Sequence, residues 1–176
     1  PNGIVIVTID KAGDEIIRIM NESQLPYIHD PKAPRFLLMD KQGKFALGIG
    51  GYVRATGEYD FGGIVDDIDF VPANIPSSSK IKNQFQMDAS TATIFLKLVG
   101  HTRLLGDFTV YTAGNFRGGD KTFQLRNAYM SFRNITVGYT YGGFMDLGAL
   151  PSTIDFQGPN GATFYRATQL SYCLLY

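Results

Sequence analysis

The sequence predicts an all-β fold, built as an antiparallel up-and-down meander of long strands. The 176-residue chain holds 20 Gly, 13 Phe and 10 Tyr and is only 18% charged, a composition that favours strands and tight turns. Apolar residues alternate with small or polar ones from Phe45 to Phe61, a run about three times as long as a typical soluble strand. All eight prolines lie outside the alternating segments, as strand hydrogen bonding requires.

Residues 1–44 are mixed in character. VIVTI (Val5–Ile9) predicts a short strand, and Ala12–Ser23 predicts about three turns of helix. The segment RFLLMDKQGKFALGI predicts a hairpin whose turn uses Gly43 as a left-handed residue. We interpret residues 1–44 as a periplasmic extension or hairpin, and residues 45–176 as the β-barrel portion.

About six strands are predicted in the barrel portion. They are Phe45–Phe61, Phe85–His101, Asp107–Phe116, Thr122–Phe132, Ile135–Gly143 and Thr163–Tyr176. In the second of these strands the alternation slips near Ser90, which predicts a β-bulge there.

Each predicted strand has one apolar face and one face of small or polar residues. In the first strand Leu47 and Ile49 belong to the apolar face, whereas Tyr52 and Arg54 belong to the other. In the fourth strand alternation assigns Phe123, Leu125 and Tyr129 to the apolar face, opposed by Gln124, Arg126 and Ala128.

The connections between these strands are unequal. In an antiparallel meander the two long ones, about residues 62–84 and 144–164, lie at the same end of the sheet. The turns at TRLLG and at Arg133–Asn134 lie at the other end. Short turns at one end and long loops at the other are typical of outer-membrane barrels, where the long loops are extracellular.

Alternation alone does not show which face meets water, because a soluble barrel buries its apolar face and a membrane barrel exposes it. Here the second face is rich in Gly, Thr, Gln, Arg and Tyr, which suits a water-filled lumen, and aromatic residues gather towards strand ends like interfacial girdles. The sequence therefore predicts a transmembrane β-barrel. Closure needs at least about eight strands, and open edges are costly in lipid. We expect the chain to be the front part of a larger barrel or to complete its sheet with other copies.

The run KLVGHTRLLGDFTVYTAGNFRGGDKTFQLRNAYMSFRNITVGYTYGGFMD, followed by LPSTIDFQGPNG, resembles the DcaP-like porin family of Gram-negative outer membranes. The phosphate-selective porins are more distant relatives. The likeness covers about Gly43 to Tyr172, and its most specific parts are Leu125–Tyr129, Val137–Asp146 and Pro151–Gly161. It implies a homotrimer of barrels, each of about sixteen strands, that passes small, mostly anionic solutes. The chain stops where the first six or so strands of that family would stop, and it lacks the arginine that the family tends to place near Thr93.

Seven residues are candidates for the lining of the pore. Arg54 and Arg126 follow from the assignment of strand faces, Lys97 follows less directly because of the slip near Ser90, and Arg117 and Arg166 lie near the loop end. A ring of cations lowers the barrier for anions in a narrow lumen. The alternative is that each arginine pairs with a lumenal carboxylate such as Glu58 or Asp60. The remaining two candidates, which either line the constriction or fill space, are Tyr52 and Tyr111.

The long connection FMDLGALPSTIDFQGPNGATF is a candidate constriction loop. In the family that the chain resembles, the matching segment lies on the extracellular side and narrows the channel. Its candidate residues here are Asp146, Asp155 and Phe156, since a carboxylate can bond neighbouring amides or bases while an aromatic ring packs inward. The alternative is a plain extracellular cover.

Catalysis has little support in the sequence, because no nucleophile elbow, phosphate-binding loop or zinc-binding motif is present. His29 and His101 are isolated, and no cofactor or metal site is predicted. The 16 basic and 16 acidic residues balance, so the chain has no net positive charge that would attract nucleic acid. We therefore expect not an enzyme but a porin, or the N-terminal portion of one, in the lipid of a Gram-negative outer membrane. The alternatives are a soluble lipocalin-like barrel for a small hydrophobic ligand and a surface interaction barrel without transport.

Overall fold

The computed structural model describes residues 4–8, 13–21, 36–61, 68, 83–143, 145 and 165–174. Almost all regular elements in these ranges are strands, and one α-helix and one 3-10 turn accompany them. The elements in chain order are β1 (Ile4–Thr8), α1 (Asp14–Asn21), β2 (Phe36–Asp40), β3 (Phe45–Tyr52), β4 (Thr56–Asp60), β5 (Gln84–Asp88), β6 (Thr93–Thr102), β7 (Gly106–Asn115), η3 (Gly119–Lys121), β8 (Gln124–Phe132), β9 (Ile135–Tyr141) and β10 (Arg166–Tyr172).

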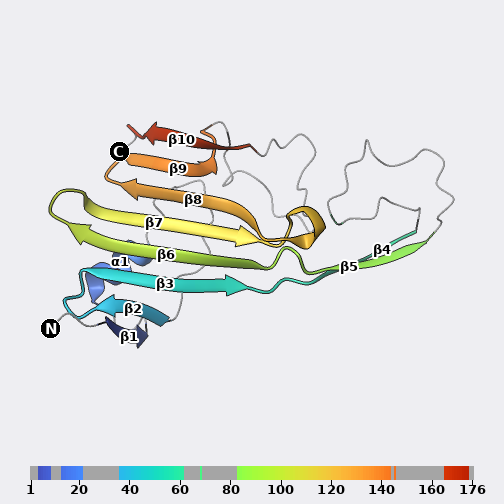
Figure 1. Cartoon of the computed structure of the whole chain (residues 1–176), viewed down its shortest axis with the longest axis horizontal. Coiled ribbons are helices and arrows are strands. Elements are labelled where there is room, and N and C mark those ends of the chain that lie inside the picture. Colours follow the sequence, from blue (N-terminus) through green and yellow to red (C-terminus); the bar gives the residue numbers. More distant parts are fainter. Residues whose placement is uncertain are drawn as a thin grey trace.

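Eight strands form one antiparallel sheet in the order β1-β2-β3-β6-β7-β8-β9-β10, while β4 and β5 pair as a separate hairpin. Figure 1 shows this hairpin extending beyond one end of the large sheet, with the tight turns β2–β3, β6–β7 and β8–β9 at the other end. Within the described residues, β1 and β10 form the two edges and do not pair with each other. The described sheet is therefore antiparallel, as predicted, and open.

The six strands predicted in the barrel portion are all present, but two of them are divided. Residues 53–55 separate β3 from β4, and residues 89–92 separate β5 from β6. The predicted slip near Ser90 is confirmed, because the four residues 89–92 lie opposite the three residues 53–55. The extra residue is accommodated in a turn in which the Ala92 amide donates to the Ala89 carbonyl (3.0 Å). Since β3 pairs with β6 and β4 pairs with β5, the two interruptions lie opposite each other.

The N-terminal elements continue the same sheet. The predicted hairpin is present as β2–β3, with Gly43 in the left-handed region (φ 67°) and the Asp40 carboxylate accepting from the amides of Lys44 (2.7 Å) and Phe45 (2.9 Å). β1 then pairs with β2. The division of the chain at residue 44 into an extension and a barrel portion stays a prediction.

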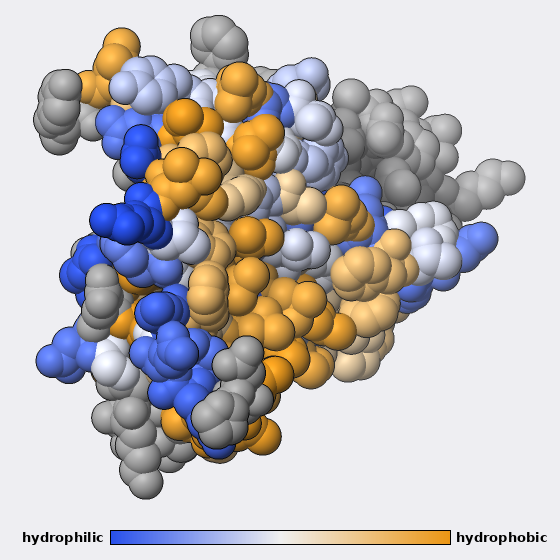
Figure 2. All heavy atoms as spheres, turned by 60° about the vertical axis from the view of Figure 1, so that its left-hand side comes forward, coloured by the Kyte–Doolittle hydropathy of each residue, from blue (hydrophilic) through white to orange (hydrophobic). Residues whose placement is uncertain are grey.

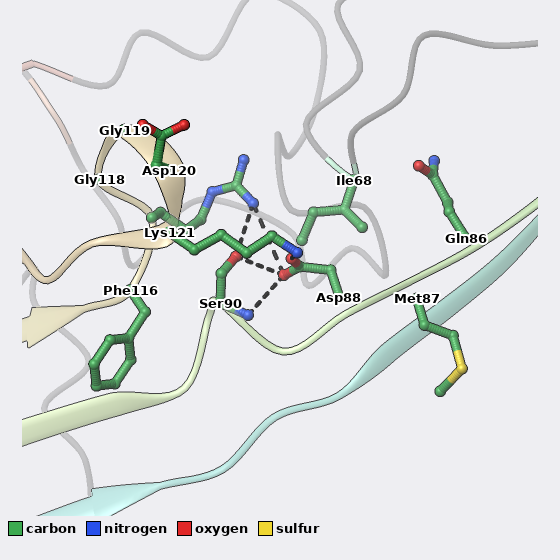
Figure 3. Close-up of a pocket in the computed structure, with 11 residues that line it drawn as sticks. Ile68, Gln86, Met87, Asp88, Ser90, Phe116, Gly118, Gly119, Asp120 and Lys121 are labelled. Carbon is green, nitrogen blue, oxygen red and sulfur yellow. Dashed lines mark hydrogen bonds and ion pairs between the residues drawn. The ribbon is translucent and has the colours of Figure 1, made fainter.

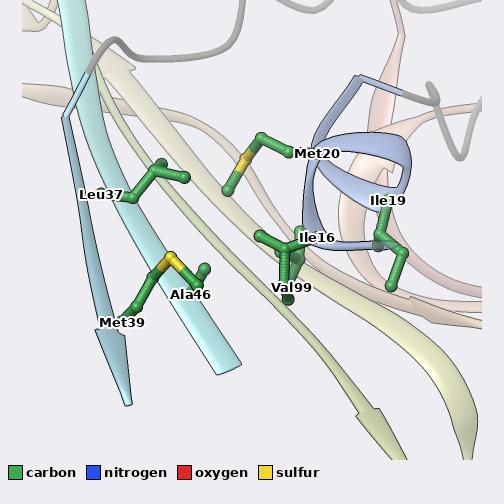
Figure 4. Packing of buried hydrophobic residues seen from close by; sticks show 7 residues of the cluster. All are labelled: Ile16, Ile19, Met20, Leu37, Met39, Ala46 and Val99. Carbon is green, nitrogen blue, oxygen red and sulfur yellow. The ribbon is translucent and has the colours of Figure 1, made fainter. Parts of the chain in front are cut away.

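Helix α1 lies against one face of this sheet, across β6 and β7. Its apolar residues meet those of β2, β3 and β6 in a cluster in which every member is at most 7% exposed (Figure 4): Ile16, Ile19, Met20, Leu37, Met39, Ala46 and Val99. The helix therefore defines the covered face of the sheet at this position.

The opposite face carries a continuous apolar row. Strand register aligns one residue from each strand: Ile6, Leu38, Leu47, Leu98, Val110, Met130, Val137 and Leu170. Figure 2 shows hydrophobic side chains gathered in a band on the molecular surface, with hydrophilic ones beside them at the end that faces left in Figure 1. Val137 and Leu170 are 41% and 74% exposed, so the row is not a dry core.

Candidate pore-lining face

The covered face of the sheet is polar over β7, β8 and β9. Thr109, Ser131 and Thr136 are aligned by register, and they are only 1%, 2% and 6% exposed. The hydroxyl groups of Ser131 and Thr136 lie 3.2 Å apart and form a hydrogen bond. Polar side chains are thus turned inward while aliphatic ones are turned outward, the reverse of a soluble sheet protein.

Exposed aliphatic residues also lie along β6, where the buried face is mixed and includes a lysine. Ile94 and Leu96 are 49% and 42% exposed, whereas the alternate residues Phe95 and Lys97 are 3% and 4% exposed. A lysine is almost never fully buried beside exposed aliphatic residues in a water-soluble protein. This strand therefore has the side-chain pattern of a membrane-barrel wall.

An aromatic row crosses the covered face. Tyr111 stacks between Phe95 and Tyr129, with ring centroids 5.9 and 5.5 Å apart, and Tyr141 packs against the same cluster. Tyr111 is 3% exposed and so is held in a packed layer rather than projecting freely. Gly138 on β9, opposite Tyr129, has φ 133°, and a Cβ atom there would overlap the backbone of Ala128 and Tyr129.

The face assignment of Tyr129 from sequence was wrong. Between β7 and β8 the register shifts: Ala113 pairs with Asn127, but Gly114 pairs with Leu125. Arg126 is the extra residue of this bulge, and a bulge inverts the alternation that follows it. Tyr129 therefore lies on the covered face with Tyr111, and Ala128 lies on the apolar face.

Lys97 lies on the covered face, opposite Gly48 and Tyr111. Its ammonium donates to the main-chain carbonyl of Met20 near the end of α1 (3.0 Å). Cations favour the last carbonyls of a helix. Strand alternation could not predict this partner, because Met20 lies 77 positions from Lys97.

Arg126 and Arg166 both lie towards the loop end of the sheet, and their positive charges repel each other. Arg166 donates from Nη2 to the Tyr141 hydroxyl, and its guanidinium carbon lies 3.9 Å from the centre of that ring. The guanidinium of Arg166 thus packs on an aromatic ring, whereas the alternative hypothesis predicted a carboxylate partner.

Arg117 meets a carboxylate, as the alternative hypothesis predicted for each arginine, and this carboxylate belongs to Asp88. Arg117 Nη1 lies 4.0 Å from Asp88 Oδ2 and donates to Ser90 Oγ (3.3 Å), and Lys121 Nζ lies 3.4 Å from Asp88 Oδ1. These contacts tie the β7–β8 turn to the β5–β6 turn beside a cavity of about 530 Å³ (Figure 3). Burial would raise the pKa of Asp88, but hydrogen bonds from Ser90 and Lys121 outweigh it, and the pKa lies below its usual value.

The remaining candidates are more exposed or lie elsewhere. Tyr52 ends β3 and is 50% exposed, and Arg54 is exposed in the segment between β3 and β4. The constriction-loop candidates lie outside the described residues: Asp146, Asp155 and Phe156.

Two further observations apply to the part of the chain that the structure describes. No helix there is both long and apolar enough to cross a membrane. No group of three or more His, Cys, Asp or Glu side chains there is placed to hold a metal ion.

An open antiparallel sheet with an exposed apolar face and a covered polar face is the architecture of part of an outer-membrane β-barrel wall. The structure matches the crystal structure of the outer membrane channel DcaP of Acinetobacter baumannii, with a TM-score of 0.59 and 20% sequence identity. The match covers 75% of this chain and 38% of that channel, so the chain spans well under half of its length. No protein-family model matches the sequence, and no curated protein matches it. The chain has the fold of part of this channel, as the sequence resemblance predicted.

Proposed function

We propose that the chain is the front part of an outer-membrane porin of a Gram-negative bacterium, and that it allows passive diffusion of small anionic solutes. The observation that carries this proposal is the reversed side-chain pattern of β7 to β10, in which Thr109, Ser131 and Thr136 are buried whereas Val137 and Leu170 on the other face are 41% and 74% exposed. An aliphatic face of this kind suits contact with lipid, and the polar face suits a lumen. The similarity to the DcaP channel supports the same reading.

A larger assembly accompanies this proposal. The two edges of the described sheet carry unpaired main-chain groups, which are costly in a bilayer, so a barrel of about sixteen strands would close between β10 and β1. We propose a homotrimer of such barrels, surrounded by outer-membrane lipid, without enzymatic activity, cofactor or nucleic-acid partner. The loop with Asp146, Asp155 and Phe156 is the proposed constriction.

The soluble lipocalin-like alternative requires the aliphatic row inside. Leu47, Val110, Leu125 and Val137 would then form a dry centre, but none of them belongs to either buried cluster, and Leu125 and Val137 are 44% and 41% exposed. The surface-interaction alternative shares the barrel and differs only in conductance.

The test is conductance of the full-length protein in planar bilayers. Arg126→Glu should shift the reversal potential in a salt gradient towards cation selectivity, because it reverses a charge beside Arg166. Arg103→Glu makes the same charge change in the exposed β6–β7 turn and should shift it much less. Absence of any conductance refutes the channel and leaves the surface-interaction alternative; equal shifts remove Arg126 from the pore lining.

A further inference from the structure

The inference concerns α1 and the part of the polar face that it covers. Where β2, β3 and β6 meet, this face carries Leu37, Met39, Ala46 and Val99 instead of hydroxyl groups, and all four are buried. Three apolar residues of α1, Ile16, Ile19 and Met20, complete the cluster (Figure 4). An apolar patch on a water-filled lumen requires a cover, so the sheet and the helix are matched to each other.

Helix α1 also accepts a hydrogen bond from the ammonium of Lys97. The Nζ donates to the Met20 carbonyl at 3.0 Å, and the residue is 4% exposed. A lysine on the lumenal face of a porin would otherwise attract anions. With α1 in place, this charge faces a helix terminus instead of the solution.

An ion pair also joins the helix to the tight-turn end of the sheet. Arg18 Nη2 lies 2.6 Å from Asp107 Oδ2, and Asp107 Oδ1 lies 2.7 Å from His101 Nδ1. Because Arg18 and Asp107 are 48% and 32% exposed, this pair contributes little free energy. The apolar cluster holds α1 in place, and the ion pair orients it.

We propose that α1 is a lumenal element that sets the charge selectivity and width of the pore by covering Lys97. This inference rests on the proposed porin function, and it goes beyond it by assigning a role to residues 14–21. Removal of α1 from its seat exposes one further cation to solutes and widens the lumen on the side of β2, β3 and β6.

The first experiment measures how accessible position 97 is to a reagent in solution, and it does not depend on conductance. Lys97→Cys is made in the Cys173→Ser background, since Cys173 is an exposed thiol, and the refolded protein is treated in detergent with the anionic thiol reagent 2-sulfonatoethyl methanethiosulfonate. Gln169→Cys is the control, because Gln169 lies on the same face away from α1. We expect position 97 to react at least about tenfold more slowly than position 169. Equal rates would overturn the inference, whether or not the protein conducts.

The second experiment unseats the helix. Ile16→Asn/Ile19→Asn places two uncharged amides in the apolar cluster, and Gln42→Asn/Leu104→Asn, in the exposed β2–β3 and β6–β7 turns, is the control with the same net charge. We expect the first variant to raise single-channel conductance and to shift the reversal potential towards anions. With Lys97→Met added, the conductance increase should remain and the anion shift should disappear.

These outcomes separate the inference from the proposed function. A parent protein that does not conduct refutes the porin, and the labelling rates still decide whether α1 covers Lys97. A parent that conducts, with the same reversal potential before and after Ile16→Asn/Ile19→Asn, refutes the role of α1 alone. If that variant does not refold, the labelling rates decide.

Discussion

Two parts of the same sheet face differ in chemistry, and the aliphatic part packs against apolar residues of α1. Under α1 the face is aliphatic, as at Leu37 and Val99, whereas over β7 to β9 it is polar, as at Thr109, Ser131 and Thr136. The strands and their pleat are continuous across both parts. The part that packs against α1 therefore resembles a small soluble core, in a sheet whose other face is aliphatic.

The largest effect tests the helix-covered part. Ile19 is fully buried, and Ile19→Ala should lower the free energy of opening of α1 by about 2–5 kcal/mol, through lost contacts and a cavity. Hydrogen exchange of the α1 amides measures this. Ile17→Ala, on the partly exposed side of the same helix, is the control and should cost less than half as much; equal losses would mean that the cluster does not hold the helix.

The next prediction contrasts the two faces at neighbouring positions of β10. Leu170 belongs to the aliphatic row and Gln169 to the polar face. Leu170→Arg should destabilise the bilayer-inserted protein by about 2–4 kcal/mol because its charge would meet hydrocarbon, whereas Gln169→Arg places the same charge towards the lumen. Urea unfolding in lipid vesicles measures both. A larger cost at Gln169 would reverse the assignment of the faces.

A smaller effect belongs to the polar part. Gly138 adopts φ 133° opposite Tyr129, and Gly138→Ala should cost about 1–3 kcal/mol through backbone strain. Gly119→Ala is the control, since a Cβ atom there meets open space. Urea unfolding followed by far-UV circular dichroism compares the two. Equal stability would show that the aromatic row does not depend on this close approach.

The smallest effect concerns the loop end, outside the segments proposed to cross the membrane. Because the pKa of Asp88 is lowered in the folded state, its contribution is present above the unfolded pKa of about 3.9 and is lost as the pH falls through the folded value. Asp88→Asn should lower the free energy of opening of the β5–β6 turn at pH 7 by about 1 kcal/mol. It should also remove the part of the pH dependence of this opening that comes from Asp88. Hydrogen exchange of the Ser90 amide, which donates to Asp88 (2.8 Å), measures this at pH 7 and pH 3. A pH profile identical to that of the parent would contradict the prediction.

Much of the fold was predictable because strand periodicity is local. Alternation along β3 and β7 placed Leu47 and Val110 on one face and Tyr111 on the other, as the register has them. Gly43 and the residues around it predicted the β2–β3 hairpin for the same reason, since a left-handed turn residue is a local requirement.

Other features depended on partners that a single strand does not reveal. The bulge at Arg126 arises where β8 pairs with β7, so the face of Tyr129 could not be obtained by alternation alone. The Lys97 ammonium and its carbonyl partner on Met20 lie 77 positions apart, and the Asp88 contacts join two turns that are distant in sequence.

The sequence by itself determined that this protein is a sheet with one aliphatic and one polar face, because a period of two is set by the backbone of each strand. Only the tertiary structure decided which cations are exposed and which are covered, as Lys97 is. A charge is solvated or buried according to what packs across from it, and here that is a helix from another part of the chain.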